Sequence, residues 1–166
     1  MDLSKLSDFS SINPYDWMNI AKREIGVKEM PGDQSESRIL EYHKHTSGKF
    51  SKDEIPWCSS FVNFVMYKAG YTGTKSAMAR SWLEWGDVIP EPRYGCIVIL
   101  SRGSDQLSGH VGFYCKAAPF LIDVLGGNQG DQVKNSWYKS SNVLGYRWPL
   151  ISNRAGGDAT PPPPLR

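Results

Sequence analysis

The feature that most constrains this chain is an apolar helical pattern that begins at a cysteine. Pro56 stands just before it, and proline fits the first turn of a helix because its missing N–H would have no partner there. Gly70 can end the same helix. Beyond Cys58, apolar residues recur at the spacing of one helix face: Phe61, Val62, Val65 and Ala69. The pattern predicts a helix over 58–69 with Cys58 on its packed face.

Cys58 has two interpretations. At the positive end of a helix dipole a thiolate is favoured, and the thiolate is the nucleophilic form of cysteine. A free cysteine is also among the residues most often buried, so Cys58 can equally be a structural core residue. This helix alone does not separate the two.

Composition describes one ordinary globular domain. The chain has 166 residues, of which 40% are hydrophobic and 22% charged, enough for a real core. A net charge of +2 is too small to indicate nucleic-acid binding, although it does not oppose an anionic polymer such as a cell wall. Six tryptophans suit either a groove that stacks on sugars or peptides, or the core.

Targeting and metal signals are missing from the sequence. No stretch of about 18 apolar residues predicts a transmembrane helix, and residues 1–5 lack the apolar run of a secretory signal peptide. We expect synthesis in the cytoplasm, so that an action outside needs release or delivery by another machine. The three cysteines form no CxxC pair and no zinc-like cluster with histidine, so neither a metal nor a cofactor is expected.

The order of predicted elements indicates an α+β fold. Helical patterns come first, over 15–25, 37–45, 58–69 and a short 77–85. Strand patterns follow, over 96–100, 110–115, 120–125, 132–137 and 143–148. Short links favour antiparallel neighbours. We expect a lead-in over 1–13, one domain over 14–152 and a disordered Pro-rich tail over 153–166.

A second chemical feature lies at the start of the strand over 110–115. His110 shares a face with Gly112 and Tyr114, and a hairpin with 120–125 brings Asn128 within reach of the imidazole. Asp123 falls further along, nearer Gly112. Enzymes with a cysteine nucleophile combine a cysteine, a histidine and a third polar residue. The histidine takes the thiol proton, and the third residue orients the imidazole ring. The alternative is a satisfied structural histidine and a turn asparagine.

Two other histidines, His43 and His45, lie two residues apart in the helix over 37–45 and point to different faces. We interpret both as surface residues without a catalytic role.

Three segments together resemble a known family. They are Pro56-Trp57-Cys58-Ser59-Ser60-Phe61-Val62-Asn63, Gly109-His110-Val111-Gly112-Phe113-Tyr114 and Leu125-Gly126-Gly127-Asn128-Gln129. In this order they resemble the papain-like cell-wall hydrolases of the NlpC-type and CHAP groups, and the resemblance runs from about Trp17 to Pro149. It implies a papain-like α+β fold, with N-terminal helices packed on an antiparallel sheet, and cleavage of an amide bond in peptidoglycan.

Carried over to this sequence, the resemblance makes Cys58 the nucleophile and His110 the general base and acid. NlpC-type enzymes often use a second histidine as the third residue, but no histidine follows His110 here. CHAP-type enzymes often use Asn or Glu, which Asn128 fits, with Asp123 as the second choice. Family strands often begin Gly-Asp-Val, where this chain has Gly95-Cys96-Ile97. Backbone N–H groups at the helix start, including that of Cys58, would hold the oxyanion.

Candidates for a substrate groove come from around these motifs: Trp57, Ser81, Trp82 and Gln129. Packing in the core is an equal interpretation for the tryptophans. Cys96 and Cys115 lie on strands that can pair, so a disulfide is conceivable, but two reduced thiols are favoured in a protein made in the cytoplasm.

The sequence therefore predicts a cysteine peptidase or amidase of peptidoglycan, either an endopeptidase or an N-acetylmuramoyl-L-alanine amidase. It would act in the periplasm or cell wall as a phage lysin, or as an antibacterial effector with a secretion carrier and an immunity protein. We expect a monomer that neither binds nucleic acid nor inserts into membranes. The alternatives are an inactive wall-binding or phage structural module of the same fold, and a thiol amidohydrolase with a non-wall substrate.

Overall fold

A computed structural model describes residues 12–32, 35–49 and 56–155. The helices are α2 (Tyr15–Arg23), α3 (Ser37–His43) and α4 (Cys58–Lys68), and the 3-10 helices are η1 (Ala79–Glu84), η2 (Ser140–Asn142) and η3 (Ile151–Asn153). The strands are β1 (Asp87–Ile89), β2 (Ile97–Ser101), β3 (Gly109–Ala118), β4 (Leu121–Gly126), β5 (Lys134–Lys139) and β6 (Val143–Trp148). Helices precede strands, which confirms the predicted α+β class.

One antiparallel sheet forms the second half of the chain, with strand order β1-β6-β2-β3-β4-β5. In the central pair of β2 and β3, Leu100 lies opposite His110. In the hairpin of β3 and β4, Phe113 lies opposite Leu125, and a bulge interrupts the register after Tyr114. This register brings the start of β3 and the end of β4 to the same end of the sheet.

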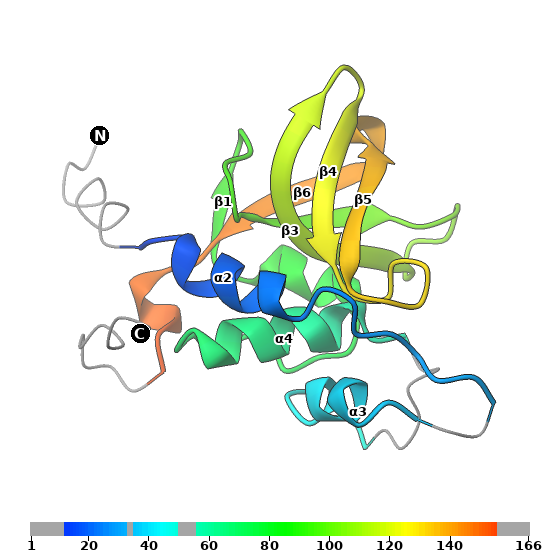
Figure 1. Cartoon of the computed structure of the whole chain (residues 1–166). Helices are drawn as coiled ribbons and strands as arrows, with labels where there is room; N and C mark the ends of the chain where they lie inside the picture. The colour runs from blue at the N-terminus through cyan, green and yellow to red at the C-terminus, as the bar shows by residue number, and fades with distance from the viewer. Residues whose placement is uncertain (1–11, 33–34, 50–55, 156–166) are drawn as a thin grey trace.

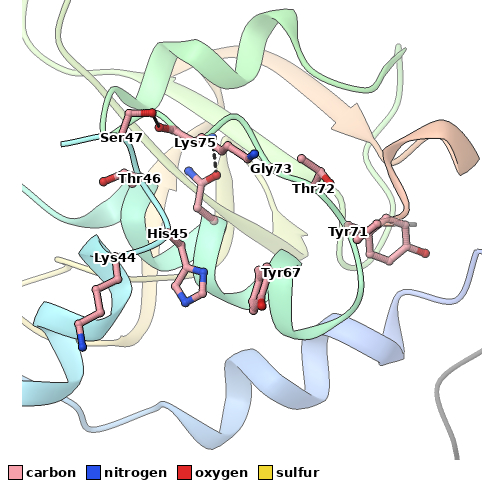
Figure 2. Close-up of a pocket in the computed structure, with 11 residues that line it drawn as sticks. Lys44, His45, Thr46, Ser47, Tyr67, Tyr71, Thr72, Gly73 and Lys75 are labelled. Atoms are coloured by element: carbon pink, nitrogen blue, oxygen red, sulfur yellow. Dashed lines mark hydrogen bonds between the residues drawn. The ribbon is translucent and has the colours of Figure 1, made fainter. Parts of the chain in front are cut away.

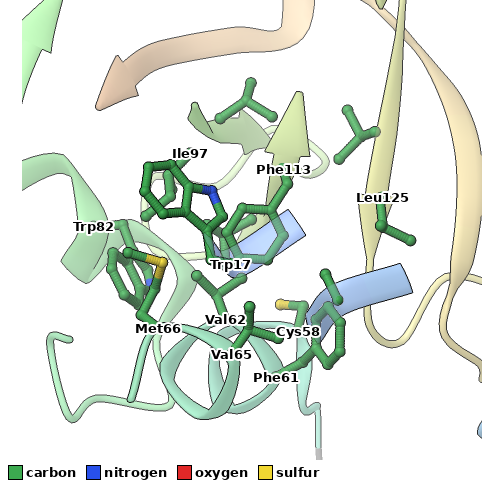
Figure 3. Packing of buried hydrophobic residues seen from close by; sticks show 14 of the residues in the cluster. Trp17, Cys58, Phe61, Val62, Val65, Met66, Trp82, Ile97, Phe113 and Leu125 are labelled. Carbon is green, nitrogen blue, oxygen red and sulfur yellow. The ribbon is translucent and has the colours of Figure 1, made fainter. Parts of the chain in front are cut away.

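Helix α4 connects the two halves of the fold. It packs on β3 and also contacts α2 and α3, so that α3 lies outside the layer next to the sheet (Figure 1). Every residue from Cys58 to Met66 is buried, because α4 is covered on more than one side. Figure 3 shows Phe61, Val62 and Val65 of α4 facing Phe113 and Leu125 of the sheet, with Trp17 of α2 beside them.

The predicted helices and strands appear in the predicted order, with some bounds shifted, and two further differences concern the kind of element. The segment over 77–85 is a 3-10 helix over Ala79–Glu84 rather than an α-helix. The Pro-rich connection before β2 contains the short strand β1, which pairs with β6. Three residues at a sheet edge carry too little periodicity to be recognised from sequence.

The predicted boundaries of the domain are only partly open to comparison. Residues 1–11 of the lead-in and 156–166 of the tail lie outside the described residues. Ile12, predicted in the lead-in, is a buried core residue. At the other end, residues 153–155 attach to the loop after α4: the Asn153 carbonyl accepts from the N–H of Thr72, and the N–H of Ala155 donates to Gly70. The first residues of the predicted tail are therefore packed.

The prediction of a surface position is wrong for His43. Its ring is buried where α3 packs on α4, and Nδ1 lies 2.8 Å from Ser60 Oγ. Helix α3 contacts α4 along one face, and His43 lies on that face. The sequence pattern over 37–45 does not show which of its residues face α4. His45 is only partly buried and packs against Tyr67.

Candidate active site

Cys58 is the first residue of α4, as the sequence predicts. Trp57 is the N-cap and makes no side-chain cap hydrogen bond within the described residues, so the cysteine lies in the first turn, where N–H groups have no partner inside the helix. The side chain points into the core face of the helix and is only 4% exposed (Figure 3). Burial raises the pKa of the Cys58 thiol, against hydrogen bonds from the backbone N–H groups of Val111, Ser59 and Cys58 that lower it. The resting group is a thiol, contrary to the thiolate that the helix dipole alone favours.

His110 is the second residue of β3 and is 6% exposed. Burial lowers the pKa of its imidazole to about 4, opposed by a hydrogen bond with Gln129 and assisted by the positive charge of Arg102. The ring is therefore neutral at pH 7 and has one nitrogen that can accept a proton.

Gln129 fixes which nitrogen of His110 carries the proton. Its amide nitrogen donates to two carbonyls, that of Val124 at 3.1 Å and that of Lys134. Carbonyls only accept, so the orientation of the amide is set and Oε1 faces the imidazole as an acceptor. His110 Nε2 lies 2.8 Å from this Oε1 and must donate its hydrogen to it. The lone pair of the neutral ring is then on Nδ1.

Tyr138 completes the support of the ring. Its side chain stacks on His110 with centroids 5.3 Å apart, and its hydroxyl donates to Gln129 Oε1 at 3.0 Å. Burial and the nearby Cys58 raise the pKa of Tyr138 to about 12, so the hydroxyl keeps its proton. The predicted strand over 132–137 stopped one residue short of it. Alternation along a longer strand could have placed Tyr138 on the His110 side of the sheet.

The chain after β4 explains why Gln129 reaches His110. A Cβ on Gly126 would lie 2.9 Å from Gln129 Oε1, and a Cβ on Gly127 would lie 2.6 Å from the Trp57 ring. Both glycines therefore permit close approach, one to the amide and one to the start of α4. Asn128 then adopts a left-handed conformation, with φ of 55°, and the turn sends the next side chain back toward the ring.

The contact predicted for Asn128 is therefore made by its neighbour. Asn128 is half-buried, and no hydrogen bond joins it to His110 in the described part of the chain. Asp123, the second choice, accepts from Asn135 Nδ2 at 3.1 Å on both oxygens, and it pairs with Lys116 in the β3–β4 register. The structure gives the ring-orienting position to Gln129, which the sequence predicts as a groove residue.

Cys58 and His110 approach each other through the start of β3. The backbone N–H of Val111, the residue after His110, lies near enough to the Cys58 sulfur to lower the pKa of the thiol. Among the described residues no direct hydrogen bond joins the thiol to the imidazole. The two side chains thus share one end of the sheet as separate neutral groups.

The predicted groove residues are mostly internal. Trp57 is fully buried and donates from Nε1 to Glu29 at 2.9 Å. Trp82 is also fully buried, and its Nε1 donates to Ser59 Oγ. Ser81 is part-buried and donates to the carbonyl of Met78 at 2.7 Å. Trp57, Trp82 and the 2% exposed Gln129 therefore present almost no surface to a polymer. The number of aromatic residues does not show whether a given ring lies in the core or on the surface. The sequence therefore predicts more groove residues than the structure exposes.

The remaining cysteines are reduced. Cys96 is buried and Cys115 half-buried, and both are free, as is Cys58. Burial raises the pKa of Cys96 to about 12. No three side chains of His, Cys, Asp or Glu within the described ranges gather as a metal site would require. Likewise, none of the described helices has the length and apolar character needed to cross a membrane.

Comparison with known proteins gives a structural neighbour. No family model matches the sequence, and no curated protein matches it. Among solved structures, a Staphylococcus aureus subsp. aureus Mu50 protein described as similar to a lipoprotein of the NLP/P60 family has a TM-score of 0.50. It is 15% identical and covers 81% of this chain, which spans 40% of that protein. At this identity the likeness concerns the fold, which is that of the papain-like group.

Proposed function

We propose that this chain is a cysteine hydrolase that cleaves an amide bond of the peptidoglycan peptide. One observation carries the proposal: Gln129 holds His110 with its proton on Nε2, and Nδ1 is left as a base at the end of the sheet where Cys58 starts α4. The NLP/P60-like fold supports the same interpretation.

The reaction follows from these groups. As substrate enters, the Cys58 thiol passes its proton to His110 Nδ1, and the sulfur attacks the amide carbonyl carbon. Backbone N–H groups at the start of α4, such as those of Cys58 and Ser59, stabilise the oxyanion. The imidazolium returns its proton to the leaving amine, and a thioester remains. Water, deprotonated by His110, then releases the acid and restores the thiol.

Digestion of purified peptidoglycan tests this function. Wild type, Cys58→Ala and Cys115→Ala are compared, with soluble products identified by mass spectrometry. We expect new muropeptides from wild type and from Cys115→Ala, which also loses a thiol, and none from Cys58→Ala. The mass of the products names the scissile bond. Equal products from Cys58→Ala would refute the role of this thiol.

An inactive wall-binding module is the second candidate. It is favoured by the buried Cys58 thiol, whose pKa is raised rather than lowered. A module of this kind would co-sediment with insoluble peptidoglycan and release nothing from it, for wild type and Cys58→Ala alike. Whether the protein acts as a phage lysin or as an effector with an immunity protein stays a prediction.

A further inference from the structure

A cavity of about 360 Å³ lies beside helix α4 (Figure 2). The end of α3, the C-terminal half of α4 and the loop after it form its walls. Its lining consists of Lys44, His45, Thr46, Ser47, Asn63, Tyr67, Tyr71, Thr72, Gly73, Lys75 and Ala155. Neither Cys58, His110 nor Gln129 is among them, so the cavity is a separate feature of the fold.

The cavity is positively charged. Two lysines line it, Lys44 and Lys75, and among the described residues its lining holds no aspartate or glutamate. Burial lowers the pKa of the His45 imidazole, and the charges of Lys68 and Lys44 lower it further while Glu41 opposes them. His45 is therefore neutral at pH 7 and available as a hydrogen-bond partner. A concave surface with one sign of charge attracts ligands of the opposite sign.

Lys75 is placed at this cavity by its backbone. It adopts φ of 57°, which is uncommon for a residue with a side chain. Its N–H donates to Asn63 Oδ1 at 2.8 Å, and its carbonyl accepts from the N–H of Ser47 at 2.8 Å. Figure 2 shows the Lys75 side chain running toward Gly73, while Lys44 extends away from the other lining residues. Lys75 is thus the cation best placed to meet a ligand.

The cavity also offers apolar surface. The Tyr67 side chain is 57% exposed, and its ring lies 4.6 Å from that of His45, centroid to centroid. An inorganic anion would use only the lysine and the hydroxyls. A volume of this size instead fits a small molecule with a body of several atoms.

We propose that this cavity binds a small organic anion, with a carboxylate at Lys75 and a short apolar body against Tyr67 and His45. The site does not depend on the proposed hydrolase activity, because it shares no residue with the Cys58 site.

Nuclear magnetic resonance of the full chain tests the proposal. The probe is acetyl-D-alanyl-D-alanine, which has one carboxylate and a short backbone, and its C-terminal amide is the matched neutral compound. We expect the acid at millimolar concentration to shift the amide resonances of Ser47, Gly73 and Lys75. The neutral amide should bind about fivefold more weakly or not at all. Inorganic phosphate should also bind more weakly than the acid.

Charge reversal supplies the matched control. Lys75→Glu should weaken binding of the acid at least about fivefold, whereas Lys139→Glu on β5 makes the same change in net charge and should leave binding unchanged. Absence of shifts at the cavity, equal binding of the amide, or an unaffected Lys75→Glu would overturn the proposal. Phosphate binding as tight as the acid would overturn the role of the apolar wall. Neither result bears on peptidoglycan cleavage by Cys58.

Discussion

Gln129 is the residue that decides which nitrogen of the His110 ring carries the proton. Its side chain satisfies four groups at once: the Val124 and Lys134 carbonyls, His110 Nε2 and the Tyr138 hydroxyl. Because the contacts with His110 and the Val124 carbonyl are buried and the other two are part-buried, an apolar side chain at this position would leave buried polar groups unpaired. The orientation of the His110 ring and the stability of this end of the sheet are therefore linked.

Replacing Gln129 by Leu should lower the free energy of unfolding by about 2–4 kcal/mol, since buried donors and acceptors lose their partners. Urea denaturation measures this loss. The neighbouring change Asn128→Gly should alter stability by less than about 0.5 kcal/mol, because glycine accepts the left-handed conformation at this position. If Asn128→Gly lowers the free energy of unfolding as much as Gln129→Leu does, the claim that Gln129 supports this end of the sheet is wrong.

At the scale of elements, α3 is fixed to α2 by a charged network. Glu24 at the end of α2 accepts from Arg38 at 2.6 Å and from the Tyr42 hydroxyl at 2.6 Å, both on α3. Burial raises the pKa of the Glu24 carboxyl, but the hydrogen bonds from Arg38 and Tyr42 outweigh burial and lower it overall. This network joins α3 to α2, and one wall of the basic cavity begins at the end of α3.

Tyr42→Phe should destabilise the fold by about 1–3 kcal/mol, because the buried Glu24 carboxylate loses a hydrogen-bond donor. Tyr15→Phe is the matched control: its side chain is 56% exposed, and the change should stay within about 0.5 kcal/mol. Both values come from chemical denaturation at pH 7. Equal effects of the two changes would show that the Tyr42 hydroxyl contributes nothing to the attachment of α3.

For the whole molecule, burial of His110 couples global stability to pH. The imidazole titrates at about 4 in the folded state and at about 6.5 when free, so the unfolded chain binds more protons between these values. Stability is therefore present above the unfolded pKa and is lost as pH falls from about 6.5 to about 4. A separation of about 2.5 pKa units corresponds to a loss of about 3 kcal/mol.

His110→Asn should remove this part of the pH dependence. We expect the difference in unfolding free energy between pH 7 and pH 4 to be about 3 kcal/mol smaller in the variant than in wild type. Urea denaturation across this range gives the slope of unfolding free energy against pH for wild type and for the variant. Subtracting one slope from the other cancels the contributions of groups that both proteins share, such as His45 and Glu24. Parallel curves for the two proteins would mean that His110 is not held neutral by the fold.

The sequence by itself determined the α+β class, the helix that begins at Cys58 and the strand that carries His110. Local periodicity carries this information, because each element reports its apolar face through residues close in the chain. It did not determine the orienting residue, since one left-handed turn at Asn128 decides whether that side chain or Gln129 meets the ring. Burial of Trp57 and the neutral state of Cys58 also came only from tertiary packing. The burial of Trp57 and the protonation state of Cys58 depend on which residues from distant segments surround each side chain. A local sequence pattern does not contain this information.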